Sequence, residues 1–396
     1  MPKSVEAIAN PALLGWARKT AGYDRATAAR KLGQDEDVLR AWESGERRMT
    51  VAQLRRLAEL YRRPLAAFYL AEPPTSFSVL RDFRRLPRGT QRAYSPELLY
   101  LIRRVIGRQE WAVEYRTRHG SPPLEFVGSE TIQSNVVEAA QRVRTLLGLS
   151  IQDQQSWRDP DGALLRWIGR CERIGLLVFQ SSDVSIDEMR GFAIPHRLAS
   201  AVLVNSKDTR AGRIFTLFHE YGHIAINAAG VSNLRVAREP QTERQKIEVF
   251  CNCLAAEILV PRDALLTDLR TGWQGDPEST IYAMHRRYSV SREVIARRLL
   301  DLAYIGQDEY AARRNQYALE AKMSRMRQRN QGPPKIPFSR IVVRDNGRQF
   351  TREVLAAYGE GEITTRDVST LLNARLGHLS GIELAVSPAR WQGAEE

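Results

Sequence analysis

Two stretches in the middle of the chain are apolar on almost every side. The first is residues 214–226, IFTLFHEYGHIAI, and the second is residues 247–261, IEVFCNCLAAEILVP. Apolar runs of this length predict helices that are buried all round. The first run also carries His219, Glu220 and His223, which are costly in an apolar helix unless a metal or a partner satisfies them.

Short runs of β-branched and aromatic residues precede the first apolar helix. They are LLVFQ at 176–180, GFAIP at 191–195 and AVLVN at 201–205, each bounded by turn residues. These runs predict three strands of a small sheet against which the 214–226 helix packs.

Helical periodicity dominates the rest of the chain. It predicts short helices at 14–20, 26–32, 36–44, 51–61 and 64–69, a long amphipathic helix at 95–118, and helices at 132–147 and 161–174. Ser291 is expected to cap a helix within 281–304. Near the C-terminus, helices are expected at 350–358 and 365–372, whereas 341–350 fits either a strand or the start of a helix. We therefore predict an α+β fold that is mostly helical.

Changes in composition suggest where domains begin and end. At 396 residues the chain is too long for one ordinary core. We expect an N-terminal five-helix domain at 1–72, a linker and long helix at 73–128, and a central domain at 129–320. A basic linker at 321–337 then leads to a small helical module at 338–396, whose tail from Pro388 onward is expected to be disordered.

Charge and cysteine content restrict the function. The formal net charge of +13 favours an anionic partner such as nucleic acid or an acidic protein, although a solvated basic surface is the simpler interpretation. Three cysteines cannot form a disulfide framework. No apolar run approaches the ~20 residues that a membrane span needs, and the N-terminus lacks a signal-peptide core. We expect a cytoplasmic protein.

The histidine pair in the first apolar helix has the spacing of a metal site. His219 and His223 are four residues apart, so both imidazoles lie on one face of the helix and reach one cation. Catalytic zinc uses such an HExxH pair together with a third protein ligand and a water molecule. Glu220 is then the base that takes the proton of that water.

The second apolar helix supplies the expected third ligand. Glu248 lies early in this helix, and Asn252 follows one turn later on the same face, where it can orient a ligand histidine. Glu257 is a competing carboxylate, but a capping or ion-paired role suits it better. Gly222 breaks helix propensity inside the motif and suggests close approach of another element.

The two apolar helices and the residues before them resemble the motifs of a known family. HEYGH and ExxCNxLAAEILVP, with VNSKDTRAGRIFTLF in front, resemble the ImmA/IrrE family of zinc metallopeptidases, whose members typically show HELGH and ExxANxFAAxLLMP. The resemblance covers about Leu176 to Tyr310. It implies that His219, His223 and Glu248 bind Zn²⁺ and that Glu220 is the catalytic base. Cys251 departs from the usual alanine, and with Cys253 nearby it leaves a thiolate ligand as an alternative.

The N-terminal segment carries a second resemblance. LGQDEDVLRAWESGERRMT is similar to the helix-turn-helix signature of the XRE family, with Leu39 and Trp42 as its buried positions. The resemblance would place Glu36, Asp37 and Arg40 against DNA. Two carboxylates there oppose the electrostatic attraction to phosphate. DNA binding and a scaffold reused for protein contacts or homodimerisation therefore both stay open.

Two functions follow from these resemblances. The first is a cytoplasmic zinc endopeptidase that cuts a regulatory protein of the repressor or antitoxin type. The second is an XRE-type regulator or antitoxin whose zinc domain acts as a sensor or binds a partner. A complete HExxH favours the peptidase, because a structural zinc site is closed by four ligands and needs no Glu220. Its substrate is expected to bind by β-augmentation on the 191–195 or 201–205 strand. Tyr221, His196 and Arg190 are candidates for the oxyanion stabiliser by chemistry alone.

Overall fold

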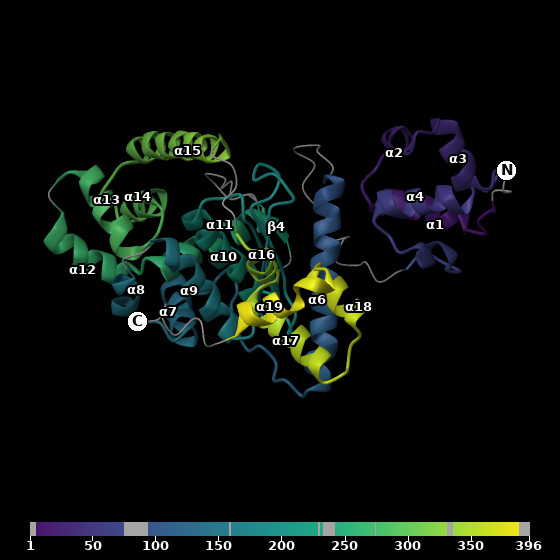
Figure 1. The fold of residues 1–396 in the computed structure, drawn as a ribbon. Helices are drawn as coiled ribbons and strands as arrows, with labels where there is room; N and C mark the ends of the chain where they lie inside the picture. Colours follow the sequence, from purple (N-terminus) through teal and green to yellow (C-terminus); the bar gives the residue numbers. More distant parts are fainter. Residues whose placement is uncertain are drawn as a thin grey trace. The chain divides into compact units, whose positions relative to one another are not determined.

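The computed structural model describes residues 5–74, 94–157, 160–228, 230–232, 242–273, 275–330 and 336–387. Compactness divides the chain into two units, Met1–Ile106 and Gly107–Glu396. The fold is mostly helical with one small sheet, as predicted (Figure 1). Residues 75–93 of the expected linker and the tail from Pro388 onward lie outside the described residues. No described helix is long and apolar enough to cross a membrane.

The N-terminal unit is a small helical core. It contains α1 (Pro11–Thr20), α2 (Arg25–Leu32), α3 (Glu36–Ser44), α4 (Val51–Tyr61), the 3-10 helix η1 (Leu65–Tyr69) and the first half of α6 (Pro96–Arg118). Gly33 ends α2 in the left-handed conformation at φ +65°, which a glycine adopts without strain. Leu39 and Trp42 are buried in this core, as the sequence predicts.

The second unit begins with the rest of α6 and places its helices around a four-stranded sheet. Before and within the sheet come α7 (Val136–Leu146), α8 (Ile151–Ser156), α9 (Pro160–Arg173), β1 (Leu177–Ser181), β2 (Gly191–Ile194), β3 (Ala201–Asn205), α10 (Arg210–Ala225) and β4 (Gly230–Ser232). After it come α11 (Glu243–Leu259), α12 (Arg262–Gly272), α13 (Pro277–Tyr288), α14 (Arg292–Asp301), α15 (Gln307–Asn330), α16 (Phe338–Asn346), α17 (Arg348–Gly359), α18 (Thr365–Leu372), the 3-10 helix η2 (Leu376–His378) and α19 (Leu379–Val386). Ser291 caps α14 by accepting from the backbone N–H of Val294, as predicted.

The sheet order is β1-β3-β2-β4. β1 runs parallel to β3, with Leu177 opposite Ala201, whereas β2 is antiparallel to both β3 and β4. All residues of β1, β2 and β3 are buried. The expectation that a substrate adds to 191–195 or 201–205 is wrong, because β2 and β3 are interior strands whose hydrogen-bonding edges are already paired. Among the described strands, the edges belong to β1 and β4.

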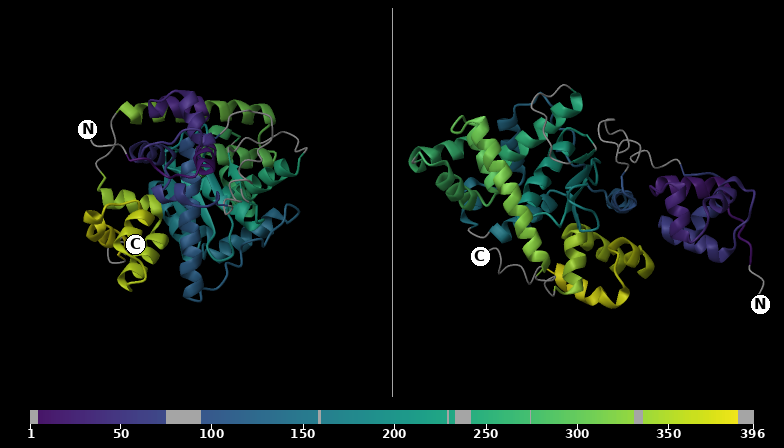
Figure 2. Two further views of the ribbon diagram at one scale, coloured as in Figure 1. Left: turned by 90° about the vertical axis from the view of Figure 1, so that its right-hand side faces the viewer. Right: turned by 90° about the horizontal axis from the view of Figure 1, so that it is seen from above.

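The segment expected to be a basic linker at 321–337 is partly helical. α15 continues to Asn330 and runs along one side of the second unit toward the C-terminal helices (Figure 2). Lys, Arg, Met and Gln fill its last turns, and these residues favour helix. The basic composition therefore reflects the end of a helix, and the Gly-Pro-Pro sequence follows it.

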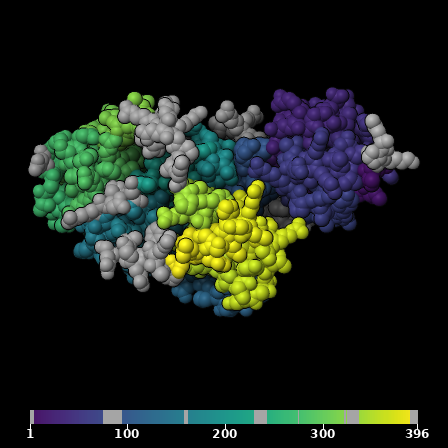
Figure 3. Space-filling view, in the orientation of Figure 1, coloured from purple at the N-terminus to yellow at the C-terminus, as the bar shows by residue number. Residues whose placement is uncertain are grey.

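The C-terminal helices α16 to α19 pack on the rest of the second unit and form the rounded yellow mass in Figure 3. Residues 341–346 are helical, which decides between the two predictions for this segment. Arg116 and Glu353 form a buried ion pair, with Nη2 and Oε1 2.8 Å apart. Phe350 meets Phe179 edge to face at a centroid distance of 5.3 Å. Glu172 of α9 caps α17, because its Oε1 accepts from the backbone N–H of Arg348 at 2.7 Å.

Candidate metal centre

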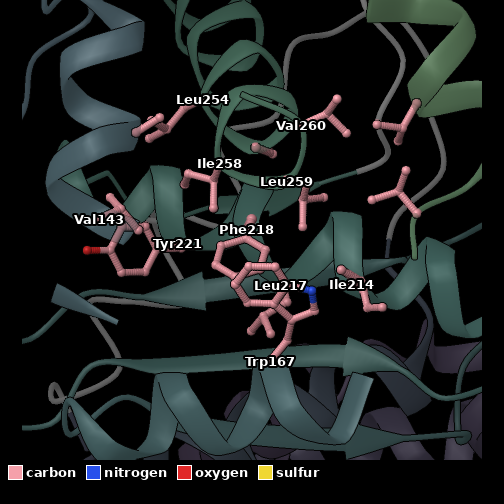
Figure 4. Close-up of a cluster of buried hydrophobic side chains, with 14 of the residues drawn as sticks. Val143, Trp167, Ile214, Leu217, Phe218, Tyr221, Leu254, Ile258, Leu259 and Val260 are labelled. Atoms are coloured by element: carbon pink, nitrogen blue, oxygen red, sulfur yellow. The ribbon is translucent and has the colours of Figure 1, made fainter. Parts of the chain in front are cut away.

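The two apolar stretches form α10 and α11, which pack against each other. Thr209 caps α10 by accepting from the N–H of Gly212, and Thr242 forms a capping box with Gln245 at the start of α11. One side of α10 enters the main hydrophobic core, where Phe218 meets Trp167 edge to face (Figure 4). His219, Glu220 and His223 are also buried.

Three ligand atoms converge between the two helices. His219 Nε2 and His223 Nε2 are 3.2 Å apart. Glu248 places Oε2 3.3 Å from the first nitrogen and Oε1 3.6 Å from the second. The predicted set of His219, His223 and Glu248 is therefore one of the two groups of possible metal ligands among the described residues.

These separations fit zinc. Zinc bonds of about 2.0–2.2 Å at tetrahedral angles place neighbouring ligand atoms roughly 3.3–3.5 Å apart. The three observed separations bracket this value, and all three side chains are of the types that zinc accepts. Three protein ligands also leave one tetrahedral position for water or substrate, as in catalytic zinc sites.

Asn252 contacts His219, as its position on the second apolar helix predicts. Its Oδ1 is 3.0 Å from His219 Nδ1. This contact fits a tautomer in which Nδ1–H donates to the amide and Nε2 keeps its lone pair for a metal. Glu248 and Asn252 are four residues apart on α11, so one face of this helix provides both a ligand and its support.

The surroundings of His223 and Glu248 lower the pKa of both side chains, which favours the deprotonated forms that bind a cation. Burial lowers the pKa of His223 to about 3, and the neighbouring His219 lowers it further, so the imidazole is neutral at pH 7. Burial alone would raise the pKa of Glu248. The hydrogen bond and charge of His219, followed by the charges of His223 and Arg244, outweigh this effect and hold the pKa of Glu248 below its ordinary value. Metal ligands of these types must be deprotonated, and both conditions are met here.

Glu220 is fully buried beside the start of β2. A Cβ atom added at Gly191 would lie 3.0 Å from Glu220 Oε1, 2.9 Å from the carbonyl oxygen of Leu203 and 2.5 Å from Thr216 Cγ2. No side chain fits at this position without displacing the carboxylate or the sheet. Gly191 thus allows Glu220 to lie between α10 and the strand.

The cysteines stay outside the ligand cluster. Cys251 is buried, and burial together with the nearby Glu248 and Glu220 raises the pKa of its thiol. Burial also raises the pKa of Cys253. Neither belongs to a group of ligand atoms among the described residues. A thiolate ligand is therefore not supported.

The other candidates have structural roles. Glu257 caps α12 through the N–H of Arg262 and pairs with Arg298, as expected for a residue that is not a ligand. Tyr221 does not suit an oxyanion stabiliser, because its ring is buried in the hydrophobic core and stacks on Phe126 (Figure 4). Arg190 pairs with Asp208.

Two histidines lie in turns. His196 follows the end of β2 opposite to Gly191, and its Nδ1 accepts from the N–H of Leu198. This position is remote from Glu220 and removes His196 from the oxyanion candidates. His285 binds the carbonyl oxygen of Val290 at the end of α13, so it is not a ligand either.

Arg244 is a residue that the sequence analysis missed. It lies one turn before Glu248 on α11, so Arg244, Glu248 and Asn252 share one face. Its charge acts on both Glu248 and His223. Within the part of the chain that the structure describes, its guanidinium forms no hydrogen bond or ion pair. Its spacing of four residues from Glu248 could have predicted that Arg244 lies on the same face of the helix.

A second group of possible ligands lies on the surface. His119 Nε2 is 3.1 Å from Glu362 Oε1 and 3.6 Å from Glu360 Oε2. Arg118 already pairs with Glu362 at 3.2 Å. Exposure and the adjacent guanidinium identify this group as a surface ion-pair cluster.

Comparison with known families identifies the part of the chain that holds the cluster. Residues 171–300 match the IrrE N-terminal-like domain of the M78 peptidase family. The matched segment contains all four residues of the cluster, His219, Glu220, His223 and Glu248, and supports the predicted relationship to metallopeptidases. No curated protein matches the chain.

The residues expected to face DNA are all exposed in the N-terminal unit. Glu36 and Asp37 occupy the first turn of α3. Arg40 Nε lies 3.4 Å from Asp37 Oδ1, and its Nη1 lies 4.0 Å from Glu46 Oε1. The one cation on this surface of α3 is therefore flanked by two carboxylates.

Proposed function

We propose that the domain containing residues 171–300 is a zinc-dependent endopeptidase that cuts a regulatory protein of the repressor or antitoxin type. The convergence of three ligand atoms from His219, His223 and Glu248 beside the buried carboxylate of Glu220 carries this proposal. A site that only holds structural zinc would be closed by a fourth protein ligand. The family match of the same segment agrees with a peptidase.

The residues have distinct roles in this reaction. Zinc, when bound, acts as a Lewis acid that polarises the scissile carbonyl and increases the acidity of water. Glu220 takes one proton from the attacking water and delivers it to the leaving amine as the peptide bond breaks. Asn252 keeps the His219 imidazole in the tautomer and orientation that a ligand needs.

Arg244 is the residue best suited to hold the substrate near this centre. A guanidinium on the ligand face of α11 donates hydrogen bonds to a peptide carbonyl or to the oxyanion that forms from it. This guanidinium forms no ion pair with any described residue, so its N–H groups can donate to a substrate. This role replaces the three oxyanion candidates named from the sequence.

The substrate backbone needs an open strand edge for β-augmentation. β2 and β3 are paired on both sides, and α16 packs against β1. We therefore place the peptide along β4, which follows α10 and, among the described strands, pairs with β2 alone.

The test compares the zinc-loaded full chain with Glu220→Gln. Casein and the proteins encoded next to this chain serve as substrates. Glutamine is nearly isosteric but cannot take the proton, so the variant should keep its zinc and lose about 100-fold to 10,000-fold in rate. Cleavage at the wild-type rate would overturn the peptidase assignment and favour the regulator.

A further inference from the structure

The N-terminal unit contains a hollow of about 490 Å³ that lies far along the chain from the peptidase motif. Three arginines line it, Arg55, Arg62 and Arg63, together with Glu59 and the ring of Tyr100. Its size is in the range of pockets that bind small molecules, about 300–1,000 Å³. Cations thus dominate its polar lining.

The end of α4 creates this concentration of charge. Arg62 adopts the left-handed conformation at φ +50° as the C-cap of α4. Its guanidinium carbon lies 4.2 Å from the centroid of Tyr100. Arg103 and Arg104, one turn further along α6, lie 6.0 Å and 5.8 Å from the same centroid. Three guanidinium groups therefore surround one aromatic ring.

Among the described residues, the more buried arginines of this cluster contact several neutral groups. Arg63 donates to Thr20 Oγ1 at 3.1 Å and lies over the ring of Trp16. Arg103 donates to the carbonyl oxygen of Tyr61 at 3.3 Å. Within the described ranges, Arg55, Arg62 and Arg103 form no ion pair, although Glu59 lines the hollow.

This arrangement carries an electrostatic cost. Burial lowers the pKa of Arg63 to about 9, and the charge of Arg103 contributes. Burial also lowers the pKa of Arg103 to about 10, and Arg62 adds to this effect. Both groups stay charged at pH 7, so like charges are held together in a partly desolvated place. A bound anion would offset this repulsion.

We propose that this hollow binds the polyphosphate of a nucleotide. Guanidinium groups bind phosphate oxygens through charge-assisted and often bidentate hydrogen bonds. Arg55 and Arg62 are exposed at the rim and meet the phosphates, while Ala58, Pro64 and Leu65 form an apolar wall for the base. A concave hollow of this size suits a small ligand better than the side of a DNA duplex.

Calorimetric titration of the full chain tests the proposal at constant ionic strength. The probes are ATP, inorganic tripolyphosphate and a 20-base-pair duplex. We expect both small anions to bind and to raise the melting temperature. Tighter binding of ATP assigns a nucleotide as the source of the phosphate, and equal binding assigns a free polyphosphate; both support the phosphate site. Binding of the duplex alone, or of no probe, would overturn it.

Variants locate the site. Arg62→Gln removes a charged donor without removing helix packing and should weaken anion binding roughly tenfold or more. Arg55→Gln should act in the same direction. Arg30→Gln is the matched control, because Arg30 is exposed on α2 outside the lining. Equal loss in Arg62→Gln and Arg30→Gln would show nonspecific attraction and sink the assignment.

Discussion

Gly222 of α10 and Cys251 of α11 lie so close together that a Cβ atom added at Gly222 would come within 3.1 Å of Cα, Cβ and Sγ of Cys251. This contact sets the separation of the two helices at the level of the ligand cluster, because Glu248 lies less than one turn before Cys251 and His223 directly follows Gly222. The glycine that breaks helix propensity in the motif is thus explained by packing, as the sequence predicted.

Gly222→Ala should therefore weaken metal binding. The added methyl group forces α10 and α11 apart and costs about 1–3 kcal/mol by overpacking, partly offset by about 1 kcal/mol of helix propensity. Zinc titration should show a lower affinity, and thermal unfolding a lower melting temperature. Gly169→Ala is the control, because nothing lies within 4 Å of its added Cβ in α9. If both variants bound zinc like the wild type, the contact would not control the ligand spacing.

Loss of a ligand should remove the metal. The purified protein should hold about one zinc per chain. His219→Ala and Glu248→Ala each leave two of three protein ligands and should deplete the metal, as measured by elemental analysis. Asn252→Ala keeps all ligands and should lower zinc affinity about 10-fold to 100-fold, because only the support of His219 is lost. Full occupancy in both ligand variants would refute the ligand set.

Arg244→Gln tests the residue that the sequence analysis missed. If Arg244 holds a substrate carbonyl, zinc content should stay constant while kcat/KM falls about tenfold or more. A rise in KM alone would indicate ground-state binding, and a fall in kcat would indicate stabilisation of the oxyanion. Lys246→Gln on the exposed side of the same helix should leave both constants unchanged. Wild-type kinetics in Arg244→Gln would contradict the assigned role.

The sequence predictions were accurate for residues close together in the chain and poor for contacts between residues far apart in the chain. His219, Glu220 and His223 share one helix, and Glu248 and Asn252 share another, so helical spacing was enough to group them. Strand order was not predictable in this way, because pairing of β1 with β3 depends on partners far apart in sequence. Tyr221 is two residues from His219 and from His223, so the same helical spacing places it on another side of α10. The capping of α17 by Glu172, across 176 residues, leaves no local pattern at all.

Glu172 should make stability depend on pH. Burial raises the pKa of Glu172 to about 7, although the backbone N–H groups of Arg348 and Gln349 oppose this shift. The folded state then binds more protons than the unfolded state between about pH 4.5 and pH 7, so this group lowers stability as pH rises through that range.

Glu172→Gln should remove this dependence, because the amide oxygen still accepts from Arg348 but does not ionise. Relative to the wild type, the variant should gain up to about 3 kcal/mol between pH 5 and pH 8. Denaturant unfolding at the two pH values measures the difference. Glu383→Gln, an exposed substitution on α19, should give no such gain. A constant difference between Glu172→Gln and wild type at both pH values would contradict the ionisation of Glu172 in this range.

If the N-terminal unit binds DNA, the two carboxylates at the start of α3 should weaken that binding. Asp37 exposes 88% of its side chain and lies beside Arg40, so it both repels phosphate and occupies the nearest cation. Replacing Glu36 with Gln and Asp37 with Asn removes two negative charges, and one of them is the nearer of the two carboxylates beside Arg40. Affinity for duplex DNA should therefore rise, and it should rise more at low salt than at high salt, because the gain is electrostatic.

Glu114→Gln with Glu383→Gln changes the net charge equally in the second unit and should have a smaller effect. A tight and sequence-specific complex of the wild-type chain that weakens when Glu36 or Asp37 is neutralised would show instead that these carboxylates read bases, and would favour the regulator over the peptidase.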